Sequence, residues 1–205
     1  MIIFLRHGQA ENNIKKILAG RTPGINLTEQ GREQAEQAAK MIKSLDISAI
    51  YSSPFDRAMQ TAEIVGKHCD IKPISDNRLI ELDMGKFTMV PYDEIFKNHG
   101  NVCLKFYEGS LEISHNGVES FAEVQKRVFD IVDFVRNEHK GQNVVLVTHM
   151  DPIKAMIGKV LSLQPEILFQ LIIANASLNI FKYDEQNYYL TSINSMNSSR
   201  FHETF

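Results

Sequence analysis

A short apolar run at the start of the chain ends in two basic side chains. Residues 2–5 are followed directly by Arg6 and His7, and then by Gly8. A guanidinium binds phosphate oxygens through two parallel hydrogen bonds. An imidazole with a neutral nitrogen can attack phosphorus and hold the transferred group covalently. These residue types, placed in this order, favour phosphoryl chemistry at the end of the first apolar segment.

Two further apolar segments lead into residues of the same kinds. The segment 47–52 comes shortly before Arg57, and the segment 144–148 comes directly before His149. In an open α/β sheet, ligands bind outside the carboxyl ends of the strands, where helix N-termini add free N–H groups. We therefore expect both arginines and both histidines to converge on one anion site, for which a phosphoryl group is the best match.

Two carboxylates in the stretch RLIELDMG are candidates for a proton donor. Glu81 on a partly desolvated loop would have the raised pKa that a general acid needs, and Asp83 is the second candidate. Taken alone, each of these histidines, arginines and carboxylates is more often an ordinary surface or hydrogen-bonded group. Their joint placement at equivalent points of one sheet favours the functional interpretation.

The elements that must position these side chains alternate between strands and helices. Short apolar runs rich in β-branched residues predict strands at 2–5, 47–52, 72–75, 144–148, 178–183 and 188–193. Helical periodicity lies between most of them. The alternation predicts an α/β fold, a three-layer sandwich with a mostly parallel central sheet flanked by helices.

Four helices have recognisable starts. Thr28 is a predicted N-cap for a helix with a buried alanine stripe, and Ser53 and Asp151 are each followed by proline, the usual pattern of a cap and a first helical residue. A further helix is predicted from about 118 to about 141.

Length and composition predict a single domain over residues 1–205. With 43% hydrophobic residues, the chain can bury one substantial core. From about 82 to 117 the periodicity breaks up into Gly, Asn, Lys and aromatic residues, which predicts an irregular, lid-like insertion over the sheet. The polar residues 194–205 have the composition of a frayed terminus.

The charge balance and the cysteines limit the partners that we expect. A net charge of -3 gives no general attraction to nucleic acid. The first apolar stretch ends at Leu5, far short of the ~20 residues of a membrane span.

Cys69 and Cys103 lie far apart in the sequence, which predicts reduced thiols in a cytoplasmic protein. No carboxylate cluster has the spacing of a metal site, so we expect neither a metal nor a cofactor. Whether two copies of the chain form a homodimer is left open by the sequence.

Six stretches of the chain form an ordered set. They are LRHGQAENN, LTEQGREQA, SSPFDRAMQTA, LIELDMG, GVESFAEVQKRV and VTHMDPIKAMI, which together span residues 2 to about 160. In order and spacing they resemble the signature blocks of the histidine phosphatase superfamily, which has the phosphoglycerate mutase-like fold. The resemblance implies that His7 is the nucleophile and Glu81 the proton donor. It also implies that the phosphoryl group is bound by Arg6, Asn13, Arg57 and His149.

A few positions depart from the family's pattern. Ala10 replaces a usual Ser or Thr, and Gln9 replaces the glutamate common in the mutase branch. Met150 stands where Gly is common, and Thr88 with Met89 stands where many phosphatases have Glu-Gly. These departures bear on rate and substrate choice more than on the phosphate-binding residues.

Three functions are compatible with this set of residues. The first is a metal-independent phosphatase that hydrolyses a small phosphorylated metabolite, a phosphomonoester, through a phosphohistidine on His7. The second is a cofactor-dependent phosphoglycerate mutase, which the short chain and Gln9 disfavour. The third is a non-catalytic module that binds a phosphorylated ligand, which the presence of His7, Arg57 and His149 disfavours, although a fold alone never fixes a function.

Overall fold

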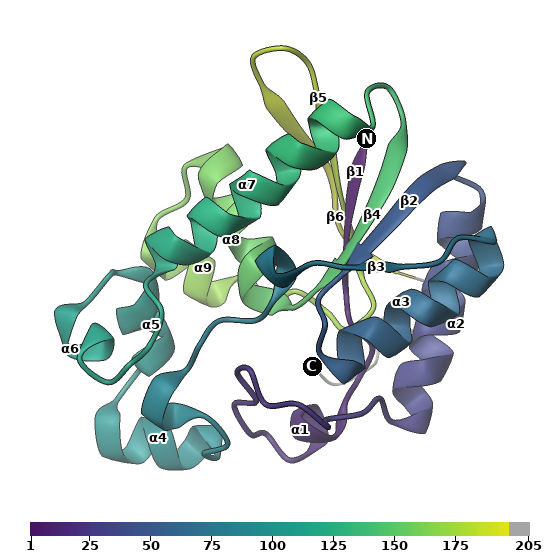
Figure 1. Cartoon of the computed structure of the whole chain (residues 1–205). Coiled ribbons are helices and arrows are strands. Elements are labelled where there is room, and N and C mark those ends of the chain that lie inside the picture. Colours follow the sequence, from purple (N-terminus) through teal and green to yellow (C-terminus); the bar gives the residue numbers. More distant parts are fainter. Residues whose placement is uncertain (197–205) are drawn as a thin grey trace.

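A six-stranded sheet forms the centre of this computed structural model, in which residues 1–196 are described (Figure 1). The strand order is β3-β2-β4-β1-β5-β6. The strands are β1 (Ile2–Arg6), β2 (Ile47–Ser52), β3 (Ile74–Ser75), β4 (Asn143–Thr148), β5 (Leu178–Tyr183) and β6 (Tyr188–Ser195). The first four strands in the order pair in parallel, and β5 and β6 are antiparallel. The predicted α/β fold with a mostly parallel sheet is confirmed.

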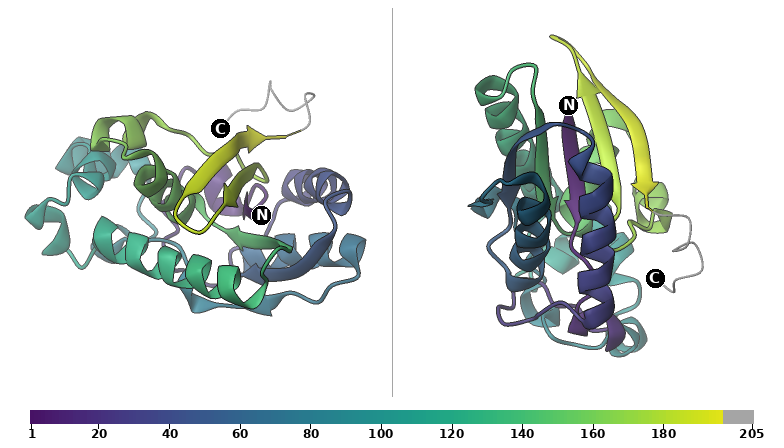
Figure 2. Two further views of the ribbon diagram at one scale, coloured as in Figure 1. Left: turned by 90° about the horizontal axis from the view of Figure 1, so that it is seen from above. Right: turned by 90° about the vertical axis from the view of Figure 1, so that its right-hand side faces the viewer.

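Helices cover both faces of the sheet (Figures 1 and 2). One face packs against α2 (Glu29–Lys43) and α3 (Asp56–Cys69), and the other against α7 (Phe121–Glu138) and α8 (Met150–Leu161). Alternate residues of β1 serve the two cores: Ile2 and Phe4 face α7 and α8, whereas Ile3 and Leu5 face α2 and α3. All four are almost fully buried, and each such side chain contributes about 1.5–3 kcal/mol of transfer free energy. Burial on both faces holds the end of β1 rigidly.

Two of the predicted helix caps are wrong. Thr28 does cap α2, since its side chain accepts a hydrogen bond from the Gly31 amide at 3.0 Å. Ser53, however, still follows the sheet, its amide donating to the Val147 carbonyl at 2.9 Å, and α3 begins only at Asp56. α8 begins at Met150 with His149 in the N-cap position, so the Asp151 side chain is available for other contacts.

The predicted long helix starts later than expected. α7 begins at Phe121 because Ser120 and Glu123 form a reciprocal capping box, with the Ser120 amide donating to the Glu123 carboxylate at 2.8 Å. It ends at Glu138, a few residues before the predicted end.

The sequence analysis predicted an irregular segment at 82–117, but the structure has regular helices there. It contains α4 (Tyr92–His99), α5 (Val102–Tyr107) and α6 (Leu111–Ser114). Aromatic contacts attach it to the main core: the rings of Phe106 and Tyr107 each lie within 5.4 Å of the Phe121 ring on α7. The remaining short elements are α1 (Glu11–Ile14), η1 (Asn77–Leu79), η2 (Gly85–Phe87) and α9 (Pro165–Gln170).

Three expectations concern the termini, the cysteines and membranes. The predicted frayed terminus falls mostly on residues 197–205, outside the described residues. Cys69 and Cys103 are both free thiols. Within residues 1–196, no helix has the length and apolar character needed to cross a bilayer.

Candidate active site

The carboxyl ends of β1 and β4 open into a small pocket of about 130 Å³. Five of the predicted site residues line it, namely Arg6, His7, Asn13, Arg57 and Glu81. The sixth, His149, lies directly behind His7, with 5.1 Å between the two ring centroids, and is not among the lining residues. The structure therefore brings the predicted residues together at one point of the fold.

The His7 ring has a fixed orientation and a defined proton. Its Nδ1 lies 2.7 Å from the Gly8 carbonyl oxygen, which can only accept, so Nδ1 carries the hydrogen. The lone pair therefore resides on Nε2, which makes no hydrogen bond within residues 1–196. Burial and the neighbouring charges of Arg57 and Arg6 lower the pKa of His7 well below its usual range. The imidazole is neutral at physiological pH, as a nucleophile must be.

Gly8 is required for packing rather than for close approach to a phosphate group. A Cβ at this position would lie 2.2 Å from the Gly31 carbonyl oxygen at the start of α2. The Gly8 amide is also occupied, because it donates to the Thr61 hydroxyl at 3.1 Å. The Gly8 backbone is therefore not available to phosphate oxygens. The glycine instead allows β1 and α2 to meet closely behind His7.

Two guanidinium groups supply the positive charge of the pocket. Arg57, at the start of α3, is 1% exposed and donates from Nη2 to the Gly20 carbonyl at 2.9 Å. Arg6 donates from Nη1 to the Ile173 carbonyl, while its buried Nε has no partner within residues 1–196. Burial lowers the pKa of Arg6 to about 10, so it stays cationic at neutral pH. An unpaired buried N–H beside a pocket is suited to an anionic ligand.

His149 is held in place by a residue that the sequence analysis did not assign to the site. Its Nε2 lies 2.8 Å from the Ser53 hydroxyl, and its buried Nδ1 has no partner among the described residues. Burial, followed by the charge of Arg57, lowers the pKa of His149 well below its usual range. A neutral ring that accepts from Ser53 at Nε2 carries its hydrogen on Nδ1, and can donate it to a ligand oxygen. The serine hydroxyl thus fixes the orientation of the ring.

Hydrogen bonds to the backbone of residues 78–81 place Glu81 at the pocket. The Thr148 hydroxyl at the end of β4 donates to the Leu79 carbonyl at 2.6 Å. Arg127 Nη1 donates to the Ile80 carbonyl at 2.6 Å, and Arg21 Nε donates to the Glu81 carbonyl at 3.1 Å. These contacts come from β4, α7 and the loop after α1, so three parts of the chain fix the position of this one carboxyl group.

The two candidate acids have different surroundings. Burial, and then the charge of Asp151, raise the pKa of Glu81 to about 7. Asp83 does not line the pocket; it accepts from the Gly85 amide at 2.9 Å and lies 3.4 Å from Arg21 Nη1. A carboxyl group that is protonated near neutral pH and faces the pocket suits proton donation, so the geometry favours Glu81.

Asp151 is a pocket residue that the sequence analysis interpreted only as a helix cap. It lies in the first turn of α8 and is 8% exposed. Its Oδ1 accepts from the Tyr107 hydroxyl at 2.5 Å, and Tyr107 accepts from Lys154 Nζ at 3.1 Å. In the sequence, only the Asp-Pro pair drew attention to Asp151. Its hydrogen-bond partner, Tyr107, lies in the helical segment 82–117, whose position over the pocket could not be predicted from the sequence.

The first loop positions Asn13 through its amide oxygen. Asn13 Oδ1 accepts from the Ala10 amide at 2.9 Å, so its NH₂ group remains for a ligand in the pocket. Gln9 is directed elsewhere, since its Oε1 accepts from the Thr28 hydroxyl at 2.9 Å. Gln9 is therefore part of the connection to α2 and is not a lining residue.

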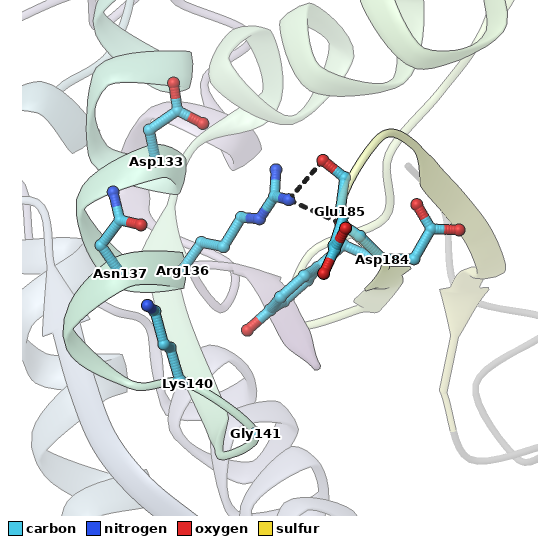
Figure 3. A pocket seen from close by; sticks show the side chains of 8 residues that line it. Asp133, Arg136, Asn137, Lys140, Gly141, Asp184 and Glu185 are labelled. Carbon is cyan, nitrogen blue, oxygen red and sulfur yellow. Dashed lines mark hydrogen bonds between the residues drawn. The ribbon is translucent and has the colours of Figure 1, made fainter.

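A larger cavity, of about 530 Å³, lies at the opposite end of the sheet (Figure 3). Arg136 on α7 reaches across it and donates to the carbonyls of Asp184 and Glu185, in the turn between β5 and β6. None of the predicted site residues lines this cavity. Its size reflects a surface depression between α7 and the β5–β6 hairpin rather than the chemistry described above. Within residues 1–196, no group of three or more His, Cys, Asp or Glu side chains has the arrangement of a metal site.

Comparisons with known proteins identify the family of the chain. The family model for the histidine phosphatase superfamily (branch 1) matches residues 2–196. A 2,3-bisphosphoglycerate-dependent phosphoglycerate mutase from Thermoplasma acidophilum is 36% identical over 180 residues, which are 87% of this chain and 84% of that one. Phosphoserine phosphatase 1 from Hydrogenobacter thermophilus is 28% identical over 196 residues, covering 94% and 91% of the two chains.

A solved structure shows the same architecture. The mycobacterial glucosyl-3-phosphoglycerate phosphatase in complex with VO3 superposes with a TM-score of 0.85 at 27% identity, covering 95% of this chain and 98% of that one. The phosphatase and mutase relatives extend over nearly all of the described residues, as does the family model. The chain therefore belongs to the histidine phosphatase superfamily, branch 1.

Proposed function

We propose that this protein is a metal-independent phosphatase that hydrolyses a small phosphomonoester through a phosphohistidine on His7. The observation that carries the proposal is the state of the His7 ring: neutral, with its hydrogen fixed on Nδ1 by the Gly8 carbonyl and with Nε2 in the pocket. The two guanidinium groups of Arg6 and Arg57 supply the charge that a transferring phosphoryl group needs.

In the first step, the Nε2 lone pair of His7 attacks phosphorus as the bond between phosphorus and the alcohol oxygen breaks. Glu81 donates its proton to the departing oxygen, so the leaving group departs as a neutral alcohol and Glu81 becomes a carboxylate. Arg6, Arg57 and His149 Nδ1–H stabilise the charge on the phosphoryl oxygens. The pKa of Glu81, raised to about 7, supports its role as the donor.

In the second step, the Glu81 carboxylate removes a proton from a water molecule whose oxygen attacks phosphorus. The P–N bond breaks, inorganic phosphate forms, and its electron pair returns to Nε2 of His7. Glu81 is protonated again and the cycle closes. Because both steps use the same cations, the enzyme needs to arrange this charge only once.

A phosphoglycerate mutase is the second candidate, and the 36% identical mutase supports it. The chemistry of the first step would be the same, but the phosphoenzyme would have to be protected from water and returned to a second substrate oxygen. Gln9, at the position of the mutase branch's glutamate, hydrogen-bonds to Thr28 instead of lining the pocket, which favours the phosphatase.

A panel of phosphomonoesters, assayed in EDTA for release of inorganic phosphate, tests the proposal. The panel includes 3-phosphoglycerate with and without 2,3-bisphosphoglycerate. Release of phosphate in EDTA supports the phosphatase, whereas conversion to 2-phosphoglycerate without net release would establish the mutase. No turnover of any ester, together with binding of phosphate, would favour the non-catalytic module.

The cellular location and the oligomeric state of the enzyme stay predictions. The free thiols of Cys69 and Cys103 support a cytoplasmic location. Whether two copies form a homodimer would be determined by sedimentation or light scattering of the full chain.

A further inference from the structure

The charges that line the pocket are unevenly distributed. Among the described residues, Arg6 and Arg57 are the lysine or arginine side chains that line it, and both belong to the phosphate-binding set. The remaining charged groups of the lining are the carboxyls of Glu81 and Asp151. A second anionic group that stays within the pocket would therefore meet no further cation among the residues that line it.

Asp151 has one oxygen in use and one available. It is 8% exposed, and Oδ1 accepts from the Tyr107 hydroxyl at 2.5 Å. Oδ2 makes no hydrogen bond within residues 1–196. Because Asp151 lines the pocket, this carboxylate can accept a hydrogen bond from a donor group on a ligand bound there.

The nearest ammonium group does not occupy that position. Lys154 donates to the Tyr107 hydroxyl at 3.1 Å, so the tyrosine separates it from the Asp151 carboxylate. Lys154 is 3% exposed and does not line the pocket. Lys154 therefore leaves the pocket side of the Asp151 carboxylate free for the substrate.

We propose that Asp151 is a specificity-determining residue, which selects phosphomonoesters whose alcohol portion carries a protonated amine and disfavours those that carry a carboxylate. The inference rests on the proposed phosphatase function. The phosphoryl group would be bound by the arginines, and the amine would donate to Asp151 Oδ2. Specificity would arise from both an attraction and a repulsion, because the same carboxylate that pairs with an ammonium group repels an anion.

Three esters of matched size test this selection. They are O-phosphoethanolamine, 2-hydroxyethyl phosphate and 2-phosphoglycolate, which carry an ammonium, a hydroxyl and a carboxylate group on the same two-carbon frame. We expect kcat/KM to fall in that order, by about tenfold or more per step, as for a hydrogen bond to a charged group. The ranking in the wild-type enzyme needs no variant, and equal or better turnover of 2-phosphoglycolate would overturn the inference.

Asp151→Asn then separates selection from general catalysis. It should lower the ratio of kcat/KM for phosphoethanolamine to that for phosphoglycolate by about tenfold or more. The matched control is Asp83→Asn, which removes a carboxylate two residues after Glu81 but outside the pocket, and should leave the ratio unchanged. An equal loss for all three esters in Asp151→Asn would mean that Asp151 only positions Glu81, and would refute the selection.

Assays with the three esters and with p-nitrophenyl phosphate distinguish a failure of the proposed function from a failure of this inference. If the wild-type protein hydrolyses neither these esters nor p-nitrophenyl phosphate, the phosphatase proposal fails. If it hydrolyses p-nitrophenyl phosphate but does not discriminate among the three esters, the phosphatase proposal stands and the role of Asp151 is refuted.

Discussion

The imidazole of His7 and the backbone carbonyl of Gly8 are joined by a hydrogen bond of 2.7 Å. Because this bond uses Nδ1, it leaves the lone pair on Nε2, the atom that we propose as the nucleophile. We predict that His7→Ala lowers kcat by at least about 10³-fold, since the variant lacks the ring nitrogen that is proposed to hold the phosphoryl group. Rapid quenching of the wild-type reaction should trap an acid-labile, base-stable phosphoprotein that the variant lacks. Near-normal activity in a folded His7→Ala protein would show that His7 is not the nucleophile.

Replacing Gly8 should damage the fold as well as the site. The Cβ of Gly8→Ala would lie 2.2 Å from the Gly31 carbonyl oxygen, so β1 or α2 must shift. We expect a loss of stability of about 1–3 kcal/mol, as for overpacking of a core, together with lower activity. Gly141→Ala is the control: its φ of 76° is strained for alanine, but nothing lies within 4 Å. Thermal unfolding in which Gly8→Ala is no less stable than this control would contradict the packing role.

Removing the acid should affect substrates according to their leaving groups. With Glu81→Gln, kcat for an alkyl phosphate should fall about 10²-fold or more, because its alkoxide needs a proton. The loss for p-nitrophenyl phosphate should be much smaller, since its phenolate leaves nearly unaided. Asp83→Asn provides the comparison. If it shows the leaving-group dependence and Glu81→Gln does not, Asp83 is the acid.

The raised pKa of Glu81 predicts how activity depends on pH. The pKa of about 7 means that the protonated donor is lost as the pH rises through neutrality, so kcat for an alkyl phosphate should decline above about pH 7. His7, with its lowered pKa, stays neutral over the same range. The decline should be absent in Glu81→Gln, and an identical profile in both proteins would exclude Glu81 as its source.

The same group should influence stability. The folded pKa of Glu81 lies above its usual value of 4.5, so the native state binds a proton that the unfolded state releases. Stability from this proton is fully present below about pH 4.5 and is lost as the pH rises through about 7. Relative to Glu81→Gln, the free energy of unfolding of the wild type should fall by about 1–3 kcal/mol over this range. Denaturant titrations at pH 5 and pH 8 would measure the difference.

Ser53 should act through His149. Ser53→Ala removes the hydroxyl that lies 2.8 Å from His149 Nε2, so the ring loses the hydrogen bond that orients it. We expect kcat to fall about tenfold, as for one lost hydrogen bond, with a small change in KM. Ser52→Ala is the matched control, because the Ser52 hydroxyl donates to the Ser53 carbonyl and touches neither histidine. Equal effects of the two substitutions on kcat would contradict the positioning role.

The sequence predicted the strands and the convergence of the site well, for a physical reason. Strands buried on both faces are apolar runs, and parallel strands place their carboxyl ends at one edge of the sheet. Arg6, the last residue of β1, pairs with Thr148, so it lies beside His149, which directly follows β4, although the two are far apart in the chain. Residues Ile2 to Leu5 are buried alternately in the two cores, one on each face of the sheet. This is why the sequence of β1 is a continuous apolar run.

The sequence could not supply the partners that come from other elements. Ser53 and Asp151 have the composition of helix caps, and local pattern gives no sign that Ser53 faces a histidine or that Asp151 accepts from a tyrosine. The helices of 82–117 were missed because their stripes are short: α4, the longest, has 8 residues. Such short helices are stabilised by packing against Phe121 and its neighbours rather than by their own periodicity.

The contact between Gly8 and Gly31 also determines where the pocket can adapt to a ligand. A Cβ at Gly31 would lie 1.9 Å from the Gln9 carbonyl oxygen, just as one at Gly8 would strike Gly31, so each backbone blocks the other. The wall that carries His7 therefore has no room to recede. Adjustment to substrates of different shape must come from other lining residues, such as Leu18 and Met84, whose side chains are singly branched or unbranched. Redesign for a larger alcohol portion should start there, with His7 and its glycine left unchanged.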